Sequence, residues 1–385
     1  MKAIITIILF VFLFQVDGRG QAARACPADR PRIEWNYSTM KKLADTGGYP
    51  RMKKLADDSL LIIYQDYLGD VDYKRSYDGG RTWSEPCRIF TQFVYSDLKG
   101  ESTVVKIANP EIYQLKNGDL VVACNYRPEK EEIAPYAIVI RRSIDNGKTW
   151  LAPQLLYSAA PRFKDGCWEP SFLQLPDSEL QVYFANENPY RQSDEQEISV
   201  LSSYDNGKTW TEKPRTVSFR KDRRDGMPVA TIIGDEIVVV IEDNNIDRFK
   251  PYIVRNKLSE NWKSPVLADS GLREYCLIEQ MNDSVYMGAP YILRLPQGET
   301  LISYQTNENR QSDWEFSTME VAIGDKSGRS FGCRTQPFPV PLDKEAKWGS
   351  LTLVNDSTVA ALTSSNRDSE KIAPWIIFGH IKYGD

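Results

Sequence analysis

Short runs of apolar residues recur six times along the chain, at intervals of about 60 residues. Runs of this length predict strands. A repeat of this period indicates a fold that uses one supersecondary unit six times. The six runs are Leu60–Tyr64, Leu120–Ala123, Leu180–Phe184, Ile237–Ile241, Leu301–Tyr304 and Val359–Leu362.

A proline stands nine to eleven residues before five of the six runs. Because proline has no backbone N–H, it is tolerated at the start or edge of a strand and marks where a strand begins. The two strands of each unit are therefore predicted to form a hairpin. The marker residues are Pro50, Pro110, Pro170, Pro228 and Pro290, and we assign Ser350 to the sixth place.

A third pattern, Ser-x-Asp-x-Gly-x-Thr-Trp, follows the first three runs at Ser76–Trp83, Ser143–Trp150 and Ser203–Trp210. Its Asp can accept bonds from nearby backbone N–H groups and its Gly can supply a positive φ, so the pattern predicts a turn. The tryptophans are expected to pack between neighbouring sheets. Drifted copies lie near 255–262 and 325–331. Each unit thus carries about four strands.

Six units of four antiparallel strands predict an all-β, six-bladed β-propeller. A solenoid is the competing architecture, but it needs atypical capping repeats with polar outer faces. Here the first and last units keep the same apolar run. Ring closure explains this pattern better.

The composition is that of a globular protein, with 26% charged and 41% hydrophobic residues. The net charge of −5 offers no basic surface, so nucleic acid is not an expected partner. The closed ring leaves no free sheet edge, and a monomer is the default expectation. No cofactor is implied. The six cysteines show no compact spacing and are expected to be buried free thiols: Cys26, Cys87, Cys124, Cys167, Cys276 and Cys333.

The first residues predict a targeting segment. Lys2 precedes an apolar run over 3–14, and small residues follow up to Ala23. The apolar run is too short to span a bilayer, so no membrane insertion is expected. We interpret residues 1–23 as a secretory signal peptide and residues 24–385 as a single catalytic propeller domain, secreted to the extracellular space or periplasm.

The possible chemistry is narrowed by a single histidine, His380. Histidine-rich zinc sites and Ser-His-Asp triads are excluded, no metal site is predicted, and carboxylates are the main candidates. In the propeller, the residues just before the prolines and at the ends of the second strands meet at one mouth of the ring. The Asp residues of the turns lie at the opposite face and are expected to be structural.

Each of these two columns contains one charged residue. Before the prolines the column reads Tyr49, Asn109, Glu169, Met227 and Ala289, with Gly349 before Ser350. At the ends of the second strands it reads Gln65, Asn125, Ala185, Glu242, Thr306 and Ser364. Glu169 and Glu242 fall in neighbouring blades, and apolar neighbours are expected to raise the pKa of one carboxyl while the other stays normal, as acid–base work requires.

The alternative is that both glutamates are structural ion-pair partners of Arg223, Arg224 or Arg255. Polar and aromatic residues near the same strand ends favour a site that binds sugar rings. The residues predicted to contact an oligo- or polysaccharide substrate are Tyr49, Asn109, Trp168, Asn186, Asp225, Tyr291 and Tyr304.

The three turn motifs resemble the Asp-boxes of the sialidase-like superfamily, and finer motifs resemble the exo-α-1,5-L-arabinanase family of glycoside hydrolases. These motifs are Gly48-Tyr49-Pro50-Arg51, Asn109-Pro110, Trp168-Glu169-Pro170, Arg224-Asp225-Gly226-Met227, Val240-Ile241-Glu242 and Gly288-Ala289-Pro290. The resemblance implies retaining hydrolysis, with Glu242 as nucleophile and Glu169 as acid and then base. Tyr304 is placed near the nucleophile as a hypothesis.

Some positions depart from that family. The stretches that flank the sugar contacts of that family read differently here, at Ala108 and in the segments 186–188 and 194–197. The identity of the sugar and of its linkage therefore stays open. An exo-sialidase is the alternative enzyme, although Gly48 stands where sialidases carry an arginine. A secreted glycan-binding propeller without turnover is the alternative of another class.

Overall fold

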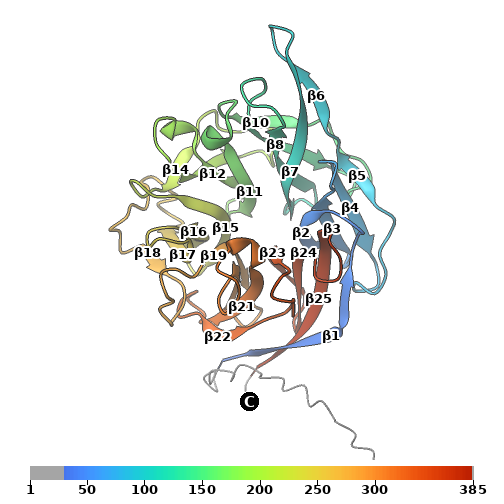
Figure 1. Cartoon of the computed structure of the whole chain (residues 1–385), viewed down its shortest axis with the longest axis vertical. Helices are drawn as coiled ribbons and strands as arrows, with labels where there is room; N and C mark the ends of the chain where they lie inside the picture. The colour runs from blue at the N-terminus through green and yellow to red at the C-terminus, as the bar shows by residue number, and fades with distance from the viewer. Residues whose placement is uncertain (1–29, 384–385) are drawn as a thin grey trace, which may run out of the picture.

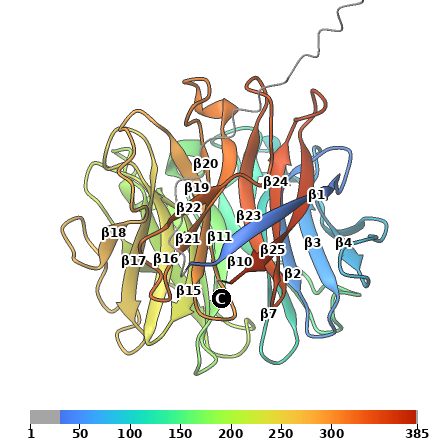
Figure 2. The ribbon, with the colours of Figure 1, turned by 90° about the horizontal axis from the view of Figure 1, so that it is seen from below.

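The computed structural model describes residues 30–383, so the predicted signal peptide and Cys26 lie outside the described residues. Six antiparallel sheets stand around a central axis (Figure 1). Their strands run roughly along that axis when the ring is seen from its rim (Figure 2). The predicted six-bladed β-propeller is confirmed.

Blades 1 to 3 follow one another along the chain. Blade 1 contains β2 (Gly48–Lys54), β3 (Leu60–Gln65), β4 (Val71–Ser76) and β5 (Cys87–Phe90). Blade 2 contains β6 (Phe93–Ser96), β7 (Ser102–Gln114), β8 (Leu120–Pro128), β9 (Ala137–Ser143) and β10 (Gln154–Ser158). Blade 3 contains β11 (Cys167–Gln174), β12 (Leu180–Asn186), β13 (Glu197–Ser203) and β14 (Arg215–Ser218).

Blades 4 to 6 complete the ring. Blade 4 contains β15 (Asp225–Ile233), β16 (Glu236–Asp243), β17 (Lys250–Lys257) and β18 (Arg273–Tyr275). Blade 5 contains β19 (Met287–Arg294), β20 (Thr300–Thr306), β21 (Thr318–Gly324) and β22 (Gly332–Thr335). Blade 6 contains β23 (Ala346–Asn355), β24 (Thr358–Ser365), β25 (Ala373–Lys382) and β1 (Arg32–Lys42).

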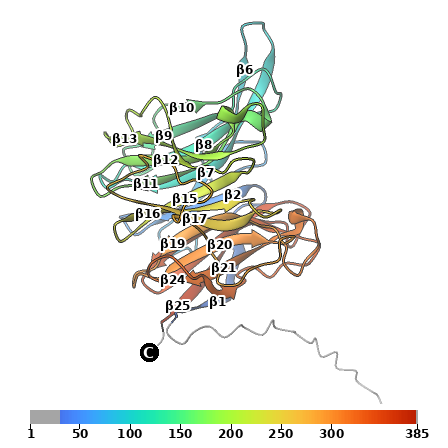
Figure 3. The same cartoon turned by 90° about the vertical axis from the view of Figure 1, so that its left-hand side faces the viewer.

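Two features differ from a plain six-by-four pattern. Blade 2 has a fifth strand, because β6 pairs with the first half of β7. This hairpin extends beyond the rim of the ring (Figures 1 and 3). Blade 6 is closed by β1, the first strand of the described residues, which pairs antiparallel with β25, the last one. Pairing the first and last described strands in one sheet leaves no open seam between them, which explains why the capping repeats of a solenoid are missing.

The core lies between neighbouring blades. The six predicted apolar runs form the second strands, β3, β8, β12, β16, β20 and β24, and most of their residues are fully buried. Trp83, Trp150 and Trp210 pack against these inter-blade clusters, as expected. Within residues 30–383 the only helices are three 3-10 turns, η1 (Phe163–Asp165), η2 (Asn188–Tyr190) and η3 (Trp314–Phe316). No helix among the described residues has the length and apolar character needed to cross a membrane.

The prediction for the cysteines is partly wrong. Cys124, Cys167 and Cys276 are buried free thiols, and Cys87 is free but exposed. Cys333 is disulfide-bonded. Its spacing from the other cysteines carried no signal for this, because a disulfide depends on how the chain folds back in space rather than on sequence distance.

Candidate active site

The inner strand of every blade is broken by a bulge at the same place. Pairing with the second strand shifts by one residue between Gly48 and Arg51 in β2, and equivalent shifts occur in the other five inner strands. One residue in each bulge adopts a positive φ of 47–53°, which is uncommon for side chains other than glycine. These residues are Tyr49, Asn109, Glu169, Met227, Ala289 and Trp348.

The bulges gather their side chains at one mouth of the ring. Tyr49, Asn109, Glu169 and Trp348 line a pocket of about 270 Å³. Tyr49 and Trp348 also pack with the two remaining members of the set, Met227 and Ala289. A bulge repeated six times therefore turns one residue of each blade toward the axis, and only one of the six carries a charge.

The assignment in the sixth blade is corrected by this geometry. Lys347 pairs with Ser364 and Ser350 with Leu362, so Trp348 occupies the bulge and Gly349 takes the place of proline. The predicted bulge position, Gly349, is therefore wrong by one residue. Without a proline as a marker, the break in register could not be located. A slip of one residue also occurred in the second strand of blade 5, where Gln305 rather than Thr306 pairs with Gly288, because the apolar run begins at Leu301 while the strand begins at Thr300.

Glu169 is the acidic member of the bulge set. It is partly buried, and no hydrogen bond or ion pair holds its carboxyl among residues 30–383. Burial, followed by the charges of Glu242 and Glu187, raises its pKa to about 8, while Arg127 and Arg224 act in the opposite direction. A carboxyl with this pKa is protonated at neutral pH and can donate a proton.

Glu242 lies at the end of β16, in the next blade. Its Oε2 accepts the backbone N–H of Ala289 at 2.7 Å. Burial raises its pKa to about 7, and the bond from Ala289 and the charge of Arg224 oppose this. The expectation of one raised and one normal pKa is therefore wrong, since both are raised. The N–H of Ala289 favours the ionised form of Glu242, and Glu169 has no such bond in the described chain, so Glu242 is expected to ionise first.

The bond from Glu242 to Ala289 belongs to a pattern shared between blades. Bulge N–H groups of the following blade are also accepted by Gln65, Gln305 and Ser364, at 2.7–3.0 Å. Position 242 therefore has a structural task that neutral side chains perform elsewhere. A structural task alone does not require a charge, and one oxygen of Glu242 remains outside this bond.

Two glycines make room for the carboxylate of Glu242. A Cβ at Gly226 would lie 2.9 Å from Oε1, and a Cβ at Gly288 would lie 2.6 Å from Oε2. The same Gly288 Cβ would also lie 2.2 Å from the hydroxyl of Tyr286. Gln305 donates a hydrogen bond to the hydroxyl of Tyr286 at 2.9 Å, and burial, followed by the charge of Glu242, raises the pKa of Tyr286. Tyr286 was missed because it belongs to neither sequence column.

Glu187 fixes the wall of the pocket beside Glu169. Its Oε2 accepts the indole N–H of Trp168 at 3.1 Å, and its Oε1 binds Arg224. Trp168 is thereby held in place, and Arg224 is held at the edge of the pocket. Glu187 lies in the segment 186–188 and was not among the residues predicted to contact the substrate.

The ion-pair alternative for the two glutamates is not what the structure contains. Arg224 pairs with Glu187, and Arg255 pairs with Glu236 and Glu274. Arg223 donates to the backbone oxygen of Asp222. Neither Glu169 nor Glu242 has an ion-pair partner among residues 30–383.

The predicted substrate residues separate into three groups. Tyr49, Asn109 and Trp168 line the same pocket as the two glutamates. Tyr291 lines a different cavity, along the axis between the inner strands. Asn186, Asp225 and Tyr304 do not line the pocket.

These three residues are engaged within the protein. Asn186 is fully buried and bonds to Tyr157 and Ser199. Asp225 is buried and forms a two-bond ion pair with Arg273. Tyr304 donates to Glu320 at 2.9 Å, which contradicts its placement beside the nucleophile. Sequence position could not tell which face of a strand end each side chain takes.

The Asp-box residues are structural, as expected. Asp205 accepts bonds from Ser203 and from the backbone and hydroxyl of Thr209. Ser203 pairs with Leu180 at the end of β12 opposite to the mouth. Within residues 30–383, no group of three or more His, Cys, Asp or Glu side chains is arranged to hold a metal ion.

Comparison with known proteins places this geometry in context. A family model described as BNR repeat-like domain matches residues 52–287. No curated protein matches the sequence. The solved structure of the GH93 α-L-arabinofuranosidase of Fusarium graminearum with arabinobiose has 15% identity and a TM-score of 0.62, with coverage of 89% of this chain and 94% of that chain.

Two further neighbours have the same fold. The α-L-arabinanase of Penicillium chrysogenum complexed with arabinobiose has 17% identity and a TM-score of 0.60, with coverage of 90% of this chain and 97% of that chain. The NanB sialidase of Streptococcus pneumoniae has 12% identity and a TM-score of 0.60, with coverage of 88% of this chain and 69% of that chain. All three neighbours are glycoside hydrolases. The resemblance to sialidase-like propellers is thus confirmed at the level of the fold.

Proposed function

This chain belongs to the BNR repeat-like domain family, and from that premise we propose that it is a retaining glycoside hydrolase using Glu242 and Glu169. The observation that carries the proposal is the pair of carboxyls with raised pKa values, about 7 and about 8, that line one pocket without ion-pair partners in the described chain. Such a pair supplies both an ionised and a protonated group near neutral pH.

The roles follow from the order of ionisation. Glu242 ionises first, and its Oε1 attacks the anomeric carbon while the bond to the leaving oxygen breaks and Glu169 donates its proton to that oxygen. In the second step, Glu169 takes a proton from a water molecule, whose oxygen bonds to the anomeric carbon as the ester bond to Glu242 breaks. The N–H of Ala289 holds Oε2 throughout and leaves Oε1 free to react.

The substrate is proposed to be an α-1,5-linked arabinan or a related plant or microbial polysaccharide, cleaved from the chain end. The motif resemblance supports this, as do two fold neighbours that were solved with arabinobiose. Position 51 argues against the sialidase alternative, because Arg51 is buried, pairs with Glu111 at 3.2 Å and lies under Tyr49. It is therefore not available to a substrate carboxylate.

The test is product analysis of the secreted protein on linear α-1,5-arabinan, with sialyl-lactose beside it. Short arabinose products that disappear in Glu169→Gln, but persist in the exposed control Glu212→Gln, would support the proposal. Release of sialic acid alone would favour the sialidase. Binding of arabinan without any product would favour a non-catalytic glycan-binding propeller.

Secretion belongs to the same proposal. If residues 1–23 are a signal peptide, the protein recovered outside the cell begins near residue 24. Sequencing the amino terminus of that protein tests the cleavage. Recovery of the chain inside the cell with residues 1–23 intact would contradict it.

A further inference from the structure

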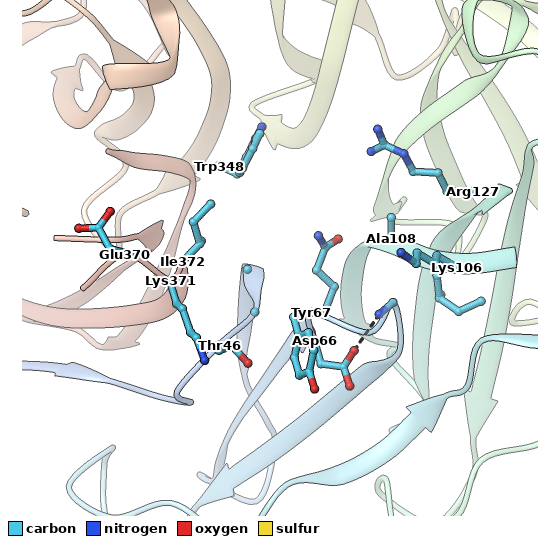
Figure 4. A pocket seen from close by; sticks show the side chains of 15 residues that line it. Thr46, Asp66, Tyr67, Lys106, Ala108, Arg127, Trp348, Glu370, Lys371 and Ile372 are labelled. Carbon is cyan, nitrogen blue, oxygen red and sulfur yellow. Dashed lines mark hydrogen bonds between the residues drawn. The ribbon is translucent and has the colours of Figure 1, made fainter. Parts of the chain in front are cut away.

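A second, larger cavity opens beside the catalytic pocket. Its volume is about 820 Å³, which lies in the range of about 300–1,000 Å³ typical of small-molecule sites. It lies between blades 1, 2 and 6, and Figure 4 shows its walls. Gln65, Arg127 and Trp348 line both this cavity and the catalytic pocket. The two spaces therefore adjoin, and a ligand longer than one sugar can occupy both.

The negative charges around this cavity are already engaged. Oδ1 of Asp66 accepts three backbone N–H groups of its own turn at 2.9 Å, and its Oδ2 pairs with Arg88. Glu370 forms an ion pair with Lys344 at 2.6 Å. Neither carboxylate needs a partner from a ligand.

Two positive charges at the same cavity form no ion pair in the described part of the chain. Lys106 pairs with Glu129 at 2.7 Å, but Arg127 and Lys371 have no carboxylate within ion-pair distance among residues 30–383. Both are exposed. They extend from opposite walls of the cavity (Figure 4). The unbalanced charge of this cavity is therefore positive, in a protein whose net charge is −5.

Arg127 also has a defined position. Its guanidinium lies 5.1 Å from the ring centre of Phe163 and 5.9 Å from that of Trp168. These contacts hold the cation at the boundary of the two spaces. Trp348 and the exposed ring of Tyr67 add aromatic surface at the same cavity, and such surface packs against the apolar faces of sugar rings.

We propose that this cavity binds acidic sugar units of the same glycan that is cleaved at Glu169 and Glu242. The carboxylates or sulfates of these units face Arg127 and Lys371, while their rings contact Trp348 and Tyr67. The proposal rests on the proposed hydrolase function. Among the α-1,5-linked arabinans and related polysaccharides proposed above, it narrows the substrate to glycans that also carry acidic units. A neutral arabinan would leave both cations without partners.

Binding is measured on the Glu242→Gln protein by calorimetry, so that no product is formed. The probes are a galacturonic acid pentasaccharide, a sulfated neutral pentasaccharide and an arabinose pentasaccharide, all at low salt. The acidic probes are expected to bind at least about tenfold more tightly than the neutral one. Added salt is expected to weaken the binding of the acidic probes and not that of the neutral probe. The stronger of the two acidic probes identifies the anionic group.

Charge reversal at Lys371 locates the site. Lys371→Glu is expected to weaken the binding of the acidic probes about fivefold, because one exposed charge then repels the probe instead of attracting it. The binding of the neutral probe is expected to stay unchanged. The matched control is Lys148→Glu, which makes the same charge change in the Asp-box turn on the opposite face. Equal binding of all three probes, or equal effects of the two variants, would overturn the proposal.

Failure of this proposal is distinguishable from failure of the hydrolase function. Suppose that the protein binds the acidic probes selectively, that Lys371→Glu weakens this binding, and that no glycan is cleaved. This result would establish the cavity as a binding site for acidic sugars and reject the hydrolase function. Cleavage of neutral arabinan with no preference for acidic probes would support the hydrolase function and reject the cavity as a site for acidic sugar units.

Discussion

Replacing Glu169 by Gln should make the protein more stable at neutral and alkaline pH while it abolishes activity. A neutral amide of the same shape removes a carboxyl whose charge is disfavoured by burial and by the nearby charges of Glu242 and Glu187. Such a group is kept for function at the expense of stability. A glutamate with a stabilising ion pair would behave in the opposite way.

The sign and size follow from the pKa. In the unfolded chain Glu169 titrates near 4.5, and in the folded protein near 8. Folding therefore favours the protonated form, so stability from this group is full below pH 4.5 and is lost as the pH rises towards 8. The full shift corresponds to about 5 kcal/mol. Because the side chain is partly exposed to water, we expect about 2 kcal/mol.

The assay is thermal unfolding of wild type and Glu169→Gln between pH 4 and pH 9. With an unfolding entropy of about 2.1 cal/mol/K per residue, 2 kcal/mol raises Tm by about 3 °C. The difference should be absent at pH 4, grow between pH 4.5 and 8, and then stay constant. Glu212→Gln, at an exposed position, should show no such difference. A wild type more stable than Glu169→Gln at pH 8 would refute the reasoning and indicate a structural glutamate.

The remaining predictions concern catalysis and packing. Glu242→Gln should keep the bond from Ala289 and unfold near the wild-type temperature, yet its kcat should fall at least about 10³-fold. A variant that loses its folded structure together with its activity would show that the residue is structural. For the wild type, kcat/KM should fall below pH about 7 and above pH about 8, since Glu242 must be ionised and Glu169 protonated; a flat profile from pH 5 to 9 would contradict this. Gly288→Ala should lower activity about 100-fold by displacing the carboxylate of Glu242, while Gly271→Ala, with open space around it, should be neutral in the same assay. Asp205→Ala should lower the unfolding free energy by about 1–2 kcal/mol in denaturant titration with kcat unchanged, and a loss of kcat would give the Asp-box a catalytic part.

Much of the fold could be predicted because the repeat is local. The spacing of Leu60, Leu120 and Leu180 reflects one hairpin per blade, and the prolines at 50, 110 and 170 mark its first strand. The Asp-box turns are formed within a few residues. Local patterns of this kind depend on strand period and turn chemistry, which the sequence states directly.

The two glutamates were also found from the sequence, because a ring of equivalent blades makes one charged position in a column stand out. Where the markers disappear, the columns slip. Trp348 was missed because no proline marks its bulge. Gln305 was missed because the column was counted from Leu301, whereas Thr300 pairs with Arg294 as Leu60 pairs with Lys54. A slip of one residue in a strand turns a side chain to the other face.

The sequence by itself determined the number of blades, the turns and the positions of Glu169 and Glu242 at one mouth. Only the tertiary structure decided which neighbours surround them. In the folded protein Glu187 and Tyr286 lie at the site, and Tyr304 donates a hydrogen bond to Glu320 instead of lying beside the nucleophile. Arg127 and Lys371 have no carboxylate partners among residues 30–383. Burial and charge balance arise from segments that are distant in the chain, so no local pattern encodes them, and they set the pKa values on which the proposed chemistry depends.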